Sequence, residues 1–431
     1  MAEKIIRDPV HDVIAFQMDR DIDALLFRLT NSEQIQRLRR IRQLGMASLT
    51  YPGADHSRYS HSLGVMATAR KMLDQLKLNS RIDAEQETVC LAAALLHDVG
   101  HGPFSHVFEH VSGVSHEIIT VRLIEDPDSD LHRILSEHDR ELPARVIALM
   151  RCEGGQGGRT FLNDILSSQL DADRFDYLLR DNLMTGSQYG GFDLQWLLHA
   201  LMVDETGDRL VVQAKGISAV EAYLQSRYHM YRNVYFHKVV RAAEGMVKLA
   251  LQRAKRLAVQ DRLEWPPRDH LVYKALLGQR LSIEQYTDLD DISVLHCFKL
   301  WMHSADAVLA RLCHGLLFRR VFKTIGLPVE GSQEQIAGTL LAAEQAVEKA
   351  GGDAGYDLFY DEPAEAPYEA YDPPYPDCAQ PRQGILVRAA DGTLTEFAAI
   401  SPLIPAINRQ LRFRRLHVAE EYRQVTAKAV G

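Results

Sequence analysis

The chain has 431 residues, 46% of them hydrophobic and 25% charged, which suits one large globular domain with a smaller appendage. Its formal net charge of -9 at pH 7 provides no electrostatic footprint for a dedicated nucleic-acid binder. Without a run of about 18 apolar residues or a charged-then-apolar leader, the sequence predicts no membrane span and a cytoplasmic location. The scattered cysteines lack a C-x-x-C pair, which argues against a disulfide framework and a thiolate zinc site; they are Cys90, Cys152, Cys297, Cys313 and Cys378.

The first fifty residues predict a short β element followed by a helix. Residues 5–16 alternate weakly around a proline, as a strand or hairpin does. Thr30, Asn31 and Ser32 provide the cap of a helical segment whose apolar stripe runs to Ile41. The polar and charged residues off that stripe are Gln36, Arg37, Arg39, Arg40 and Arg42. They predict a solvated basic face, with a phosphate-binding role for part of it as the alternative.

Two further helices carry candidate metal ligands. A Pro/Gly-rich loop over residues 51–58 leads into an amphipathic helix with His61 in its first turn. Residues 89–96 are apolar nearly all round, which predicts a helix buried inside a bundle. This helix delivers His97 and Asp98 side by side. Because a buried aspartate is costly unless it is paired or bound to a cation, the pair indicates a metal site or an ion pair.

A helix with an acidic face is predicted over residues 167–181. Three polar side chains recur every four residues and share one face of it: Asp173, Tyr177 and Asp181. Carboxylates in nearby turns repel each other, so a cation or a ring of donors must lie close to them. Taken alone, the pattern also fits a solvated acidic face with Arg174 and Arg180 as local partners.

A single helical segment over residues 223–238 alternates aromatic and cationic side chains. The tyrosines are Tyr223, Tyr228, Tyr231 and Tyr235, and the interleaved residues are Arg227, His229, Arg232, His237 and Lys238. Aromatic faces with cations between them suit a nucleotide, because rings can flank the base or sugar while cations hold phosphates. The alternative is an amphipathic helix whose tyrosines pack into the core while its cations reach the solvent.

Two stretches have the composition of loops. Residues 152–158 are glycine-rich and indicate a flexible connector, since no strand, Lys or Ser/Thr stands in the register of a phosphate loop. Residues 351–381, rich in Gly, Pro, Tyr and acidic residues, indicate a surface excursion or lid. Beyond them, residues 385–397 predict a hairpin and residues 412–418 a strand.

The chemistry depends on combining two imidazoles with two carboxylates, namely His61, His97, Asp98 and Asp173. Together they neutralise a divalent ion and leave two octahedral positions free, one for water and one for a phosphate oxygen. This is the arrangement of a hydrolase. The mixed nitrogen and oxygen set favours Mn, Fe, Co, Ni or Zn over Mg, although Mg could bind alongside substrate phosphates.

The flanks of these residues resemble the HD-domain phosphohydrolases, and within them the SAM-and-HD-domain deoxynucleoside triphosphate triphosphohydrolases and their bacterial relatives. The matching motifs are QLG at 43–45, YPGADHSRYSHSLG at 51–64, HDVGHGPFSH at 97–106 and DADRFDY at 171–177. The resemblance covers about residues 4–240. It implies a mainly α fold: a helical bundle with a short N-terminal β element in a core of residues 1–260. Residues 261–431 then form a small α+β C-terminal region.

The resemblance also implies roles for single residues. The metal ligands are the four named above, and the acid/base group comprises His101, Glu109 and His116. Residues that surround the triphosphate are Arg58, His106, Arg174, Tyr177 and Arg227. Gln43 and Asp181 bind the sugar 3′-hydroxyl, and Tyr235 excludes ribose at the 2′ position. Water attacks the α-phosphorus, so that intact triphosphate leaves, and His101 protonates the 5′-oxygen.

Relatives assemble, so a homo-oligomer, either a dimer or a tetramer, is expected, with Gln36 and Arg39 facing a partner subunit. The sequence departs from the regulatory guanine site of nucleotide-activated members, because Arg7, Asn31 and Trp196 stand at three of its positions. Regulation by dGTP or GTP of that kind is therefore not predicted. Phe236 also replaces a polar neighbour of the base.

Two other classes of function stay open. One is a phosphatase acting on nucleoside mono- or diphosphates or on a signalling nucleotide; Arg174 and Arg227 favour a longer phosphate chain. The cyclic-dinucleotide HD-GYP subgroup fits less well, because the GYP triplet is missing. The other class is a non-catalytic nucleotide-sensing or nucleic-acid-binding module, which the complete ligand set and the negative charge disfavour.

Overall fold

The structure, a computed structural model, describes residues 3–152, 160–366, 368, 371–372, 382–407 and 411–431. It is mainly helical, which confirms the predicted fold class. The helices up to the end of the predicted core are α1 (Asp21–Thr30), α2 (Glu33–Arg37), α3 (Arg58–Leu76), α4 (Ala84–Leu96), α5 (His106–Ser112), α6 (His116–Glu125), α7 (Asp130–His138), α8 (Leu142–Met150), α9 (Phe161–Leu166), α10 (Ala172–Thr185), α11 (Leu194–Ala200), α12 (Ile217–Met230) and α13 (Lys238–Val259). The later helices are α14 (Leu271–Leu276), α15 (Ile283–Thr287), α16 (Asp291–Trp301), α17 (Ala307–Leu317), α18 (Gln333–Lys349), α19 (Ala354–Asp357), α20 (Phe397–Ile400), α21 (Ile404–Ile407) and α22 (Arg423–Val430).

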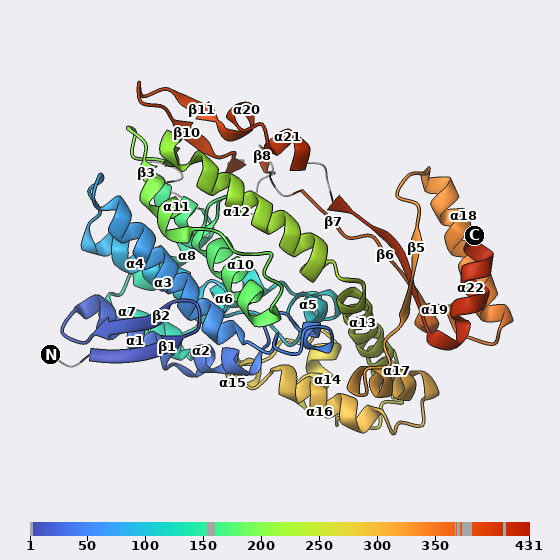
Figure 1. Cartoon of the computed structure of the whole chain (residues 1–431). Coiled ribbons are helices and arrows are strands. Elements are labelled where there is room, and N and C mark those ends of the chain that lie inside the picture. The colour runs from blue at the N-terminus through green and yellow to red at the C-terminus, as the bar shows by residue number, and fades with distance from the viewer. Residues whose placement is uncertain (1–2, 153–159, 367, 369–370, 373–381, 408–410) are drawn as a thin grey trace.

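The strands are short and form small sheets at the edges of the helical body (Figure 1). They are β1 (Glu3–Asp8), β2 (Asp12–Gln17), β3 (Leu201–Val203), β4 (Leu210–Gln213), β5 (Lys323–Leu327), β6 (Leu358–Asp361), β7 (Ala364–Glu365), β8 (Tyr371–Asp372), β9 (Arg382–Gln383), β10 (Leu386–Arg388), β11 (Leu394–Glu396), β12 (Leu411–Arg412) and β13 (Arg414–Val418). β1 and β2 form the predicted N-terminal hairpin, and β10 and β11 form the predicted hairpin near residue 390.

Helices α3, α4 and α10 pack together and carry the predicted metal ligands. The segment Val89–Leu96 of α4 is buried on every side, as its all-round apolar sequence predicts. Asp83 caps the start of this helix by accepting a hydrogen bond from the backbone N–H of Gln86. The helix ends at Leu96, so His97 and Asp98 lie at its C-terminal end, inside the molecule.

Two sheets that contain C-terminal strands lie on different sides of the molecule (Figure 1). β10 and β11 join β3 and β4 in one sheet, in which β10 runs parallel to β4. On the other side of the molecule, β13 pairs with β5 and β6, and helices α18 and α22 pack together beside this sheet. The domain boundary at residue 260 stays a prediction. Contacts cross it in several places described below.

The structure corrects the predicted basic face. Helix α2 ends at Arg37, and a 3₁₀ turn over Leu38–Arg40 follows. Arg37 is not solvated but buried, with an exposed fraction of 1%. Its guanidinium donates hydrogen bonds to the backbone carbonyls of Leu289, Val99 and His101. A buried guanidinium is tolerated here because three carbonyls accept its protons.

Two other predicted segments differ from the structure. The single helix over residues 223–238 is interrupted: α12 ends at Met230, residues Tyr231–Tyr235 form a π-helical turn, and His237 caps the start of α13. The excursion over residues 351–381 begins with ordered elements, α19, β6 and β7, because Phe359 packs against Gly245 of α13. Residues 367, 369–370 and 373–381 of that prediction, and most of the glycine-rich stretch 152–158, lie outside the described part of the chain.

None of the helices that the structure describes combines the length and apolar character needed to cross a lipid bilayer. Three of the cysteines, Cys90, Cys297 and Cys313, are buried. Burial raises the pKa of the Cys90 and Cys297 thiols to about 12, as expected of structural thiols.

Candidate active site

Three helices bring the four predicted metal ligands together. His61 lies in the first turn of α3, His97 and Asp98 follow α4, and Asp173 lies in the first turn of α10. His61 Nε2 lies 2.9 Å from Asp173 Oδ1 and 3.8 Å from Asp98 Oδ2. His97 Nε2 lies 3.6 Å from Asp173 Oδ1 and 3.4 Å from Asp98 Oδ1. Within the described residues, ligand atoms of His61, His97 and Asp98 lie within 4.8 Å of one another, and Asp173 lies beside both imidazoles.

The hydrogen bonds around the imidazoles fit a metal ion. His61 Nδ1 donates to Asp176 Oδ2 at 2.8 Å, and His97 Nδ1 donates to the carbonyl of Ala94 at 2.9 Å. Each ring therefore keeps the lone pair on Nε2, and within the described residues neither Nε2 has a hydrogen-bond partner. Two buried lone pairs next to two carboxylates make a donor set that suits a transition metal.

The pKa values of the clustered side chains also fit a cation at this site. Burial alone lowers the pKa of His61, but the neighbouring carboxylates of Asp173 and Asp176 outweigh this and raise it to about 10. Burial raises the pKa of Asp98, yet His97 and Arg58 hold it well below its ordinary value. The cluster therefore favours a positive charge at its centre, which is the electrostatic condition for binding a cation.

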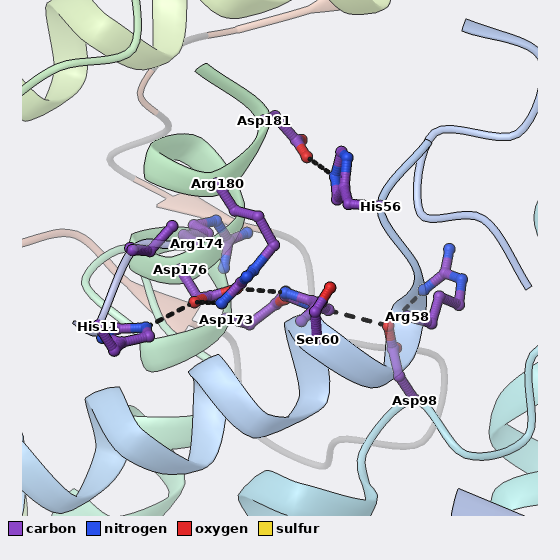
Figure 2. A network of polar contacts seen from close by, with 12 residues as sticks. His11, His56, Arg58, Ser60, Asp98, Asp173, Arg174, Asp176, Arg180 and Asp181 are labelled. Atoms are coloured by element: carbon purple, nitrogen blue, oxygen red, sulfur yellow. Dashed lines mark hydrogen bonds and ion pairs between the residues drawn. The ribbon is translucent and has the colours of Figure 1, made fainter. Parts of the chain in front are cut away.

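Asp176, which the sequence analysis did not single out, fixes the orientation of His61 through their 2.8 Å hydrogen bond. Figure 2 shows Asp176 with two of its other partners, His11 and Arg180. Besides His61, it accepts hydrogen bonds from Arg180 of the same helix and, at 2.8 Å, from His11 Nε2 of the N-terminal hairpin. Lys71 donates to the other ring nitrogen of His11, so His11 Nε2 carries the proton. Arg180 is fully buried, which excludes the solvated acidic face considered as an alternative.

Gly64 makes this close packing of α3 against α10 possible. A Cβ atom at this position would lie 1.9 Å from Asp176 Oδ1 and 2.3 Å from an Arg180 nitrogen. Any side chain there would push the carboxylate away from His61. The close packing of α3 against α10 therefore explains why the predicted motif has a glycine at position 64.

The predicted acid/base group lies beside Asp98. The rings of His101 and His116 are stacked with centroids 3.7 Å apart. Glu109 lies 2.9 Å from His116 Nδ1 and 3.3 Å from His101 Nδ1, while His101 Nε2 lies 3.3 Å from Asp98. Burial and the neighbouring Arg58 lower the pKa of His101 to about 4.

The loop that carries His101 is held by residues from beyond position 260. The hydroxyl of Tyr286 donates to the carbonyl of Gly100, and Asp291 accepts a hydrogen bond from the backbone N–H of Phe104. Arg37 holds the carbonyl of His101 itself. Phe104 and Ser105 adopt φ angles of 52° and 54°, a left-handed conformation that non-glycine residues rarely adopt. These contacts stabilise a strained loop next to the metal ligands.

A cavity of about 850 Å³ opens above the ligands and collects most of the predicted site residues on its wall. These are Gln43, Arg58, His97, Asp98, His101, His116, Asp173, Arg174, Tyr177, Asp181 and Tyr235. His61 lies beneath the wall. Arg227 is buried behind it, and the side chain of His106 lies outside the described part of the structure.

At one end of the cavity, two side chains form hydrogen bonds with Asp181. The Tyr235 hydroxyl donates to Asp181 Oδ2 at 2.8 Å, and His56 Nε2 donates to Asp181 Oδ1 at 2.8 Å. His56 was not among the predicted site residues, although it lies in the predicted loop motif. The side-chain oxygen of Gln43, in contrast, is buried and has no hydrogen-bond partner within the described residues.

The C-terminal region forms a further wall that the sequence analysis missed. The cavity is lined by residues 359–361 of β6 and by residue 362, which follows the strand. Arg241 and Glu244 of α13 also line it. Arg241 pairs with Asp361 at 2.6 Å, which ties this strand to the core. No local sequence signal connects these two segments, which are more than a hundred residues apart.

Comparison with known proteins agrees with this geometry. The family model described as the HD domain matches residues 58–181, and the model of the HD-associated region matches residues 192–263. The chain is 35% identical to the protein YwfO of Bacillus subtilis over 415 residues, which cover 95% of this chain and 90% of YwfO. The chain belongs to the HD-domain phosphohydrolase family. This HD-domain protein superposes with a TM-score of 0.80 on the crystal structure of a phosphohydrolase from Bacteroides thetaiotaomicron, with 30% sequence identity over 97% of this chain and all of that one.

A further relative carries a more specific description. The HD-domain chain is 29% identical over 303 residues to the deoxynucleoside triphosphate triphosphohydrolase SAMHD1 homolog of Dictyostelium discoideum. These residues cover 67% of this chain and 57% of that relative.

Proposed function

We propose that this HD-domain phosphohydrolase uses a divalent transition metal to hydrolyse deoxynucleoside triphosphates to a deoxynucleoside and triphosphate. The observation that carries the proposal is the single cavity. It brings together three of the four predicted metal ligands, the two acid/base histidines, two arginines predicted to bind phosphate and the Tyr235–Asp181 pair; the histidines are His101 and His116, and the arginines are Arg58 and Arg174. The named activity of the Dictyostelium relative supports the choice of substrate.

The metal would be held by His61, His97, Asp98 and Asp173. When bound, such an ion polarises a phosphate oxygen and lowers the pKa of a coordinated water. The chain contributes the orientation of its ligands: the hydrogen bonds from His61 to Asp176 and from His97 to Ala94 keep both Nε2 lone pairs directed at the site.

We assign protonation of the leaving 5′-oxygen to Nε2 of His101. Glu109 lies on the opposite side of the ring, 3.3 Å from Nδ1, where it stabilises the charged imidazole. The charges of bound phosphates next to Arg58 would also favour the protonated ring, because they offset the positive charge that lowers its pKa.

The cavity wall divides into a phosphate side and a sugar side. Arg58, Arg174 and Tyr177 offer donors to phosphate oxygens. On the sugar side, the unpartnered oxygen of Gln43 and the carboxylate of Asp181 suit a 3′-hydroxyl. The Tyr235 ring, fixed by its bond to Asp181, would leave no room for a 2′-hydroxyl. This arrangement selects a deoxyribose.

A substrate panel tests the proposal. The metal-loaded protein is incubated with dATP, dADP, dAMP and ATP, and the products are separated by anion-exchange chromatography. We expect dATP to be consumed fastest, with deoxyadenosine and triphosphate as products. Faster release of inorganic phosphate from dADP or dAMP would instead favour the general nucleotide phosphatase.

A homo-oligomer remains part of the proposal. Arg39 is exposed and Gln36 is half-buried; the Arg39 guanidinium donates to Gln36 and lies 3.7 Å from the ring centroid of Tyr59. Light scattering at micromolar concentration, with and without nucleotide, tests this assembly. A monomer under both conditions would contradict it.

A further inference from the structure

Arg227, predicted to bind the triphosphate, is engaged by an acidic residue of the C-terminal region. Its Nη2 donates to Glu365 Oε1 at 2.7 Å, and its Nη1 donates to Gln169 Oε1 at 3.1 Å. Arg227 lies on α12 in the core, whereas Glu365 lies on β7, which pairs with β12. The ion pair therefore connects the predicted phosphate site to a strand 138 residues further along the chain.

Arg227 is not among the residues that line the cavity. Its guanidinium lies 5.5 Å from the ring centroid of Tyr231, which lines the cavity, while Arg227 itself is buried behind that wall. Arg174, in contrast, lies on the wall and pairs with Asp171 of its own helix cap. The Nη2 proton that Glu365 accepts becomes available to a phosphate only after the carboxylate releases it, whereas Nε has no hydrogen-bond partner within the described residues.

The two partners differ in exposure. The Arg227 side chain is 6% exposed and that of Glu365 is 30% exposed. Leaving the buried guanidinium without an anion is costly, whereas the carboxylate can turn toward water at small cost. Glu365 supplies the anion that Arg227 needs, and a phosphate oxygen offers the same charge to the same donor.

We propose that Glu365 competes with the substrate's phosphates for Arg227 and so lowers the affinity of the free enzyme for triphosphates. The proposal rests on the proposed function, because it takes Arg227 as a phosphate ligand. Since the contact exists only before substrate binds, its loss strengthens binding and leaves the chemical step in place. Glu365 on strand β7 thus raises the KM of the enzyme for its triphosphate substrate.

Glu365→Gln tests the competition, because the amide keeps the size of the side chain and removes its charge. We expect KM for dATP to fall about threefold to tenfold, with kcat changed by less than about twofold. The Kd of inorganic triphosphate, measured by calorimetry, should fall by the same factor. In an Arg227→Ala background, the same substitution should leave the triphosphate Kd unchanged, because the two residues act as a pair.

Glu205→Gln is the matched control. It removes another ion pair between core and C-terminal region, that of Glu205 with Arg388, and its exposed position lies off the cavity wall. KM and Kd should equal those of the wild type. Glu365→Ala, with folding checked by circular dichroism, provides a second variant that should also bind triphosphate more tightly.

The outcomes separate this proposal from the proposed function. Hydrolysis of dATP with the same KM and triphosphate Kd in wild type and Glu365→Gln would overturn the competition and leave the function standing. Tighter triphosphate binding by the variant without dATP hydrolysis in either protein would overturn the function alone. If triphosphate binds neither protein, Arg227 is not a phosphate ligand and the competition is overturned.

Discussion

His61 Nδ1 and Asp176 Oδ2 lie 2.8 Å apart, and both side chains are completely buried. This bond decides which ring nitrogen of His61 carries the proton and leaves Nε2 directed at Asp98 and Asp173. The Asp176 carboxylate is also held by Arg180 and by His11. The N-terminal hairpin therefore supports the predicted metal ligand His61 through Asp176. The orientation of His61 thus depends in part on the first dozen residues of the chain.

Asp176→Asn should weaken metal binding, because an amide cannot accept all the hydrogen bonds that the carboxylate accepts. We expect metal to be lost to a chelator about tenfold to a hundredfold faster than from wild type. Metal content over time, measured by atomic emission, follows the loss without relying on activity. His11→Ala, which removes only one donor, should have a smaller effect in the same direction.

Asp23→Asn is the matched control for Asp176→Asn. Asp23 is also fully buried and paired with an arginine, Arg70, but it lies on α1 away from the ligands. Its substitution should leave metal retention unchanged. Equal rates of metal loss from wild type, Asp176→Asn and His11→Ala would show that Asp176 does not position His61.

The protein should purify with a transition metal, because the clustered carboxylates of Asp98 and Asp173 need a cation. Treatment with a chelator should abolish hydrolysis, and addition of Mn or Co should restore it. Asp98→Ala should lose both metal and activity while its circular dichroism spectrum stays that of wild type. Full turnover by a variant lacking His97 and Asp98 would refute the metal assignment.

Arg37→Met should destabilise the protein, because three buried carbonyls lose their donor. We expect the free energy of unfolding in denaturant to fall by about 3 kcal/mol, with kcat lowered as the His101 loop loosens. Arg39→Met, two residues away on the exposed side, should change it by less than about 1 kcal/mol. Equal effects of the two substitutions would contradict the anchoring role of Arg37.

Sugar selectivity should depend on Tyr235. Wild type should hydrolyse dATP with a kcat/KM about tenfold to a few hundredfold above that for ATP, since ribose must clash or leave a buried polar group unpaired. Tyr235→Ala should narrow the gap chiefly by admitting ATP, whereas Tyr235→Phe keeps the ring and most of the selectivity. Dideoxy-ATP should turn over poorly, because it gives Gln43 and Asp181 no 3′-hydroxyl. Equal constants for dATP and ATP in wild type would remove the deoxynucleotide assignment.

Local sequence patterns were enough to predict the helices that carry the site. The all-round apolar run before His97 and the four-residue spacing of Asp173, Tyr177 and Asp181 are properties of single helices, and the structure has those helices in place. A motif shared with a family then predicted which of these residues act together.

The partners of these residues could not be predicted in the same way. His11 is 165 residues from Asp176, and Arg37 is 252 residues from Leu289, so only tertiary packing decides that they meet. A charge pattern also does not tell whether a side chain is buried, which is why Arg37 was assigned to the solvated face. Glu365 belongs to an acidic, proline-rich segment whose composition indicates a surface loop rather than a partner for Arg227.

The position of bond cleavage tests the central claim most directly. The metal-loaded protein is incubated with dATP in ¹⁸O-labelled water, and the products are identified by ³¹P NMR and mass spectrometry. Attack of water on the α-phosphorus with release of the 5′-oxygen predicts deoxyadenosine without label and intact triphosphate that carries one ¹⁸O atom. Labelled dAMP with pyrophosphate, or labelled inorganic phosphate with dADP, would contradict a triphosphohydrolase.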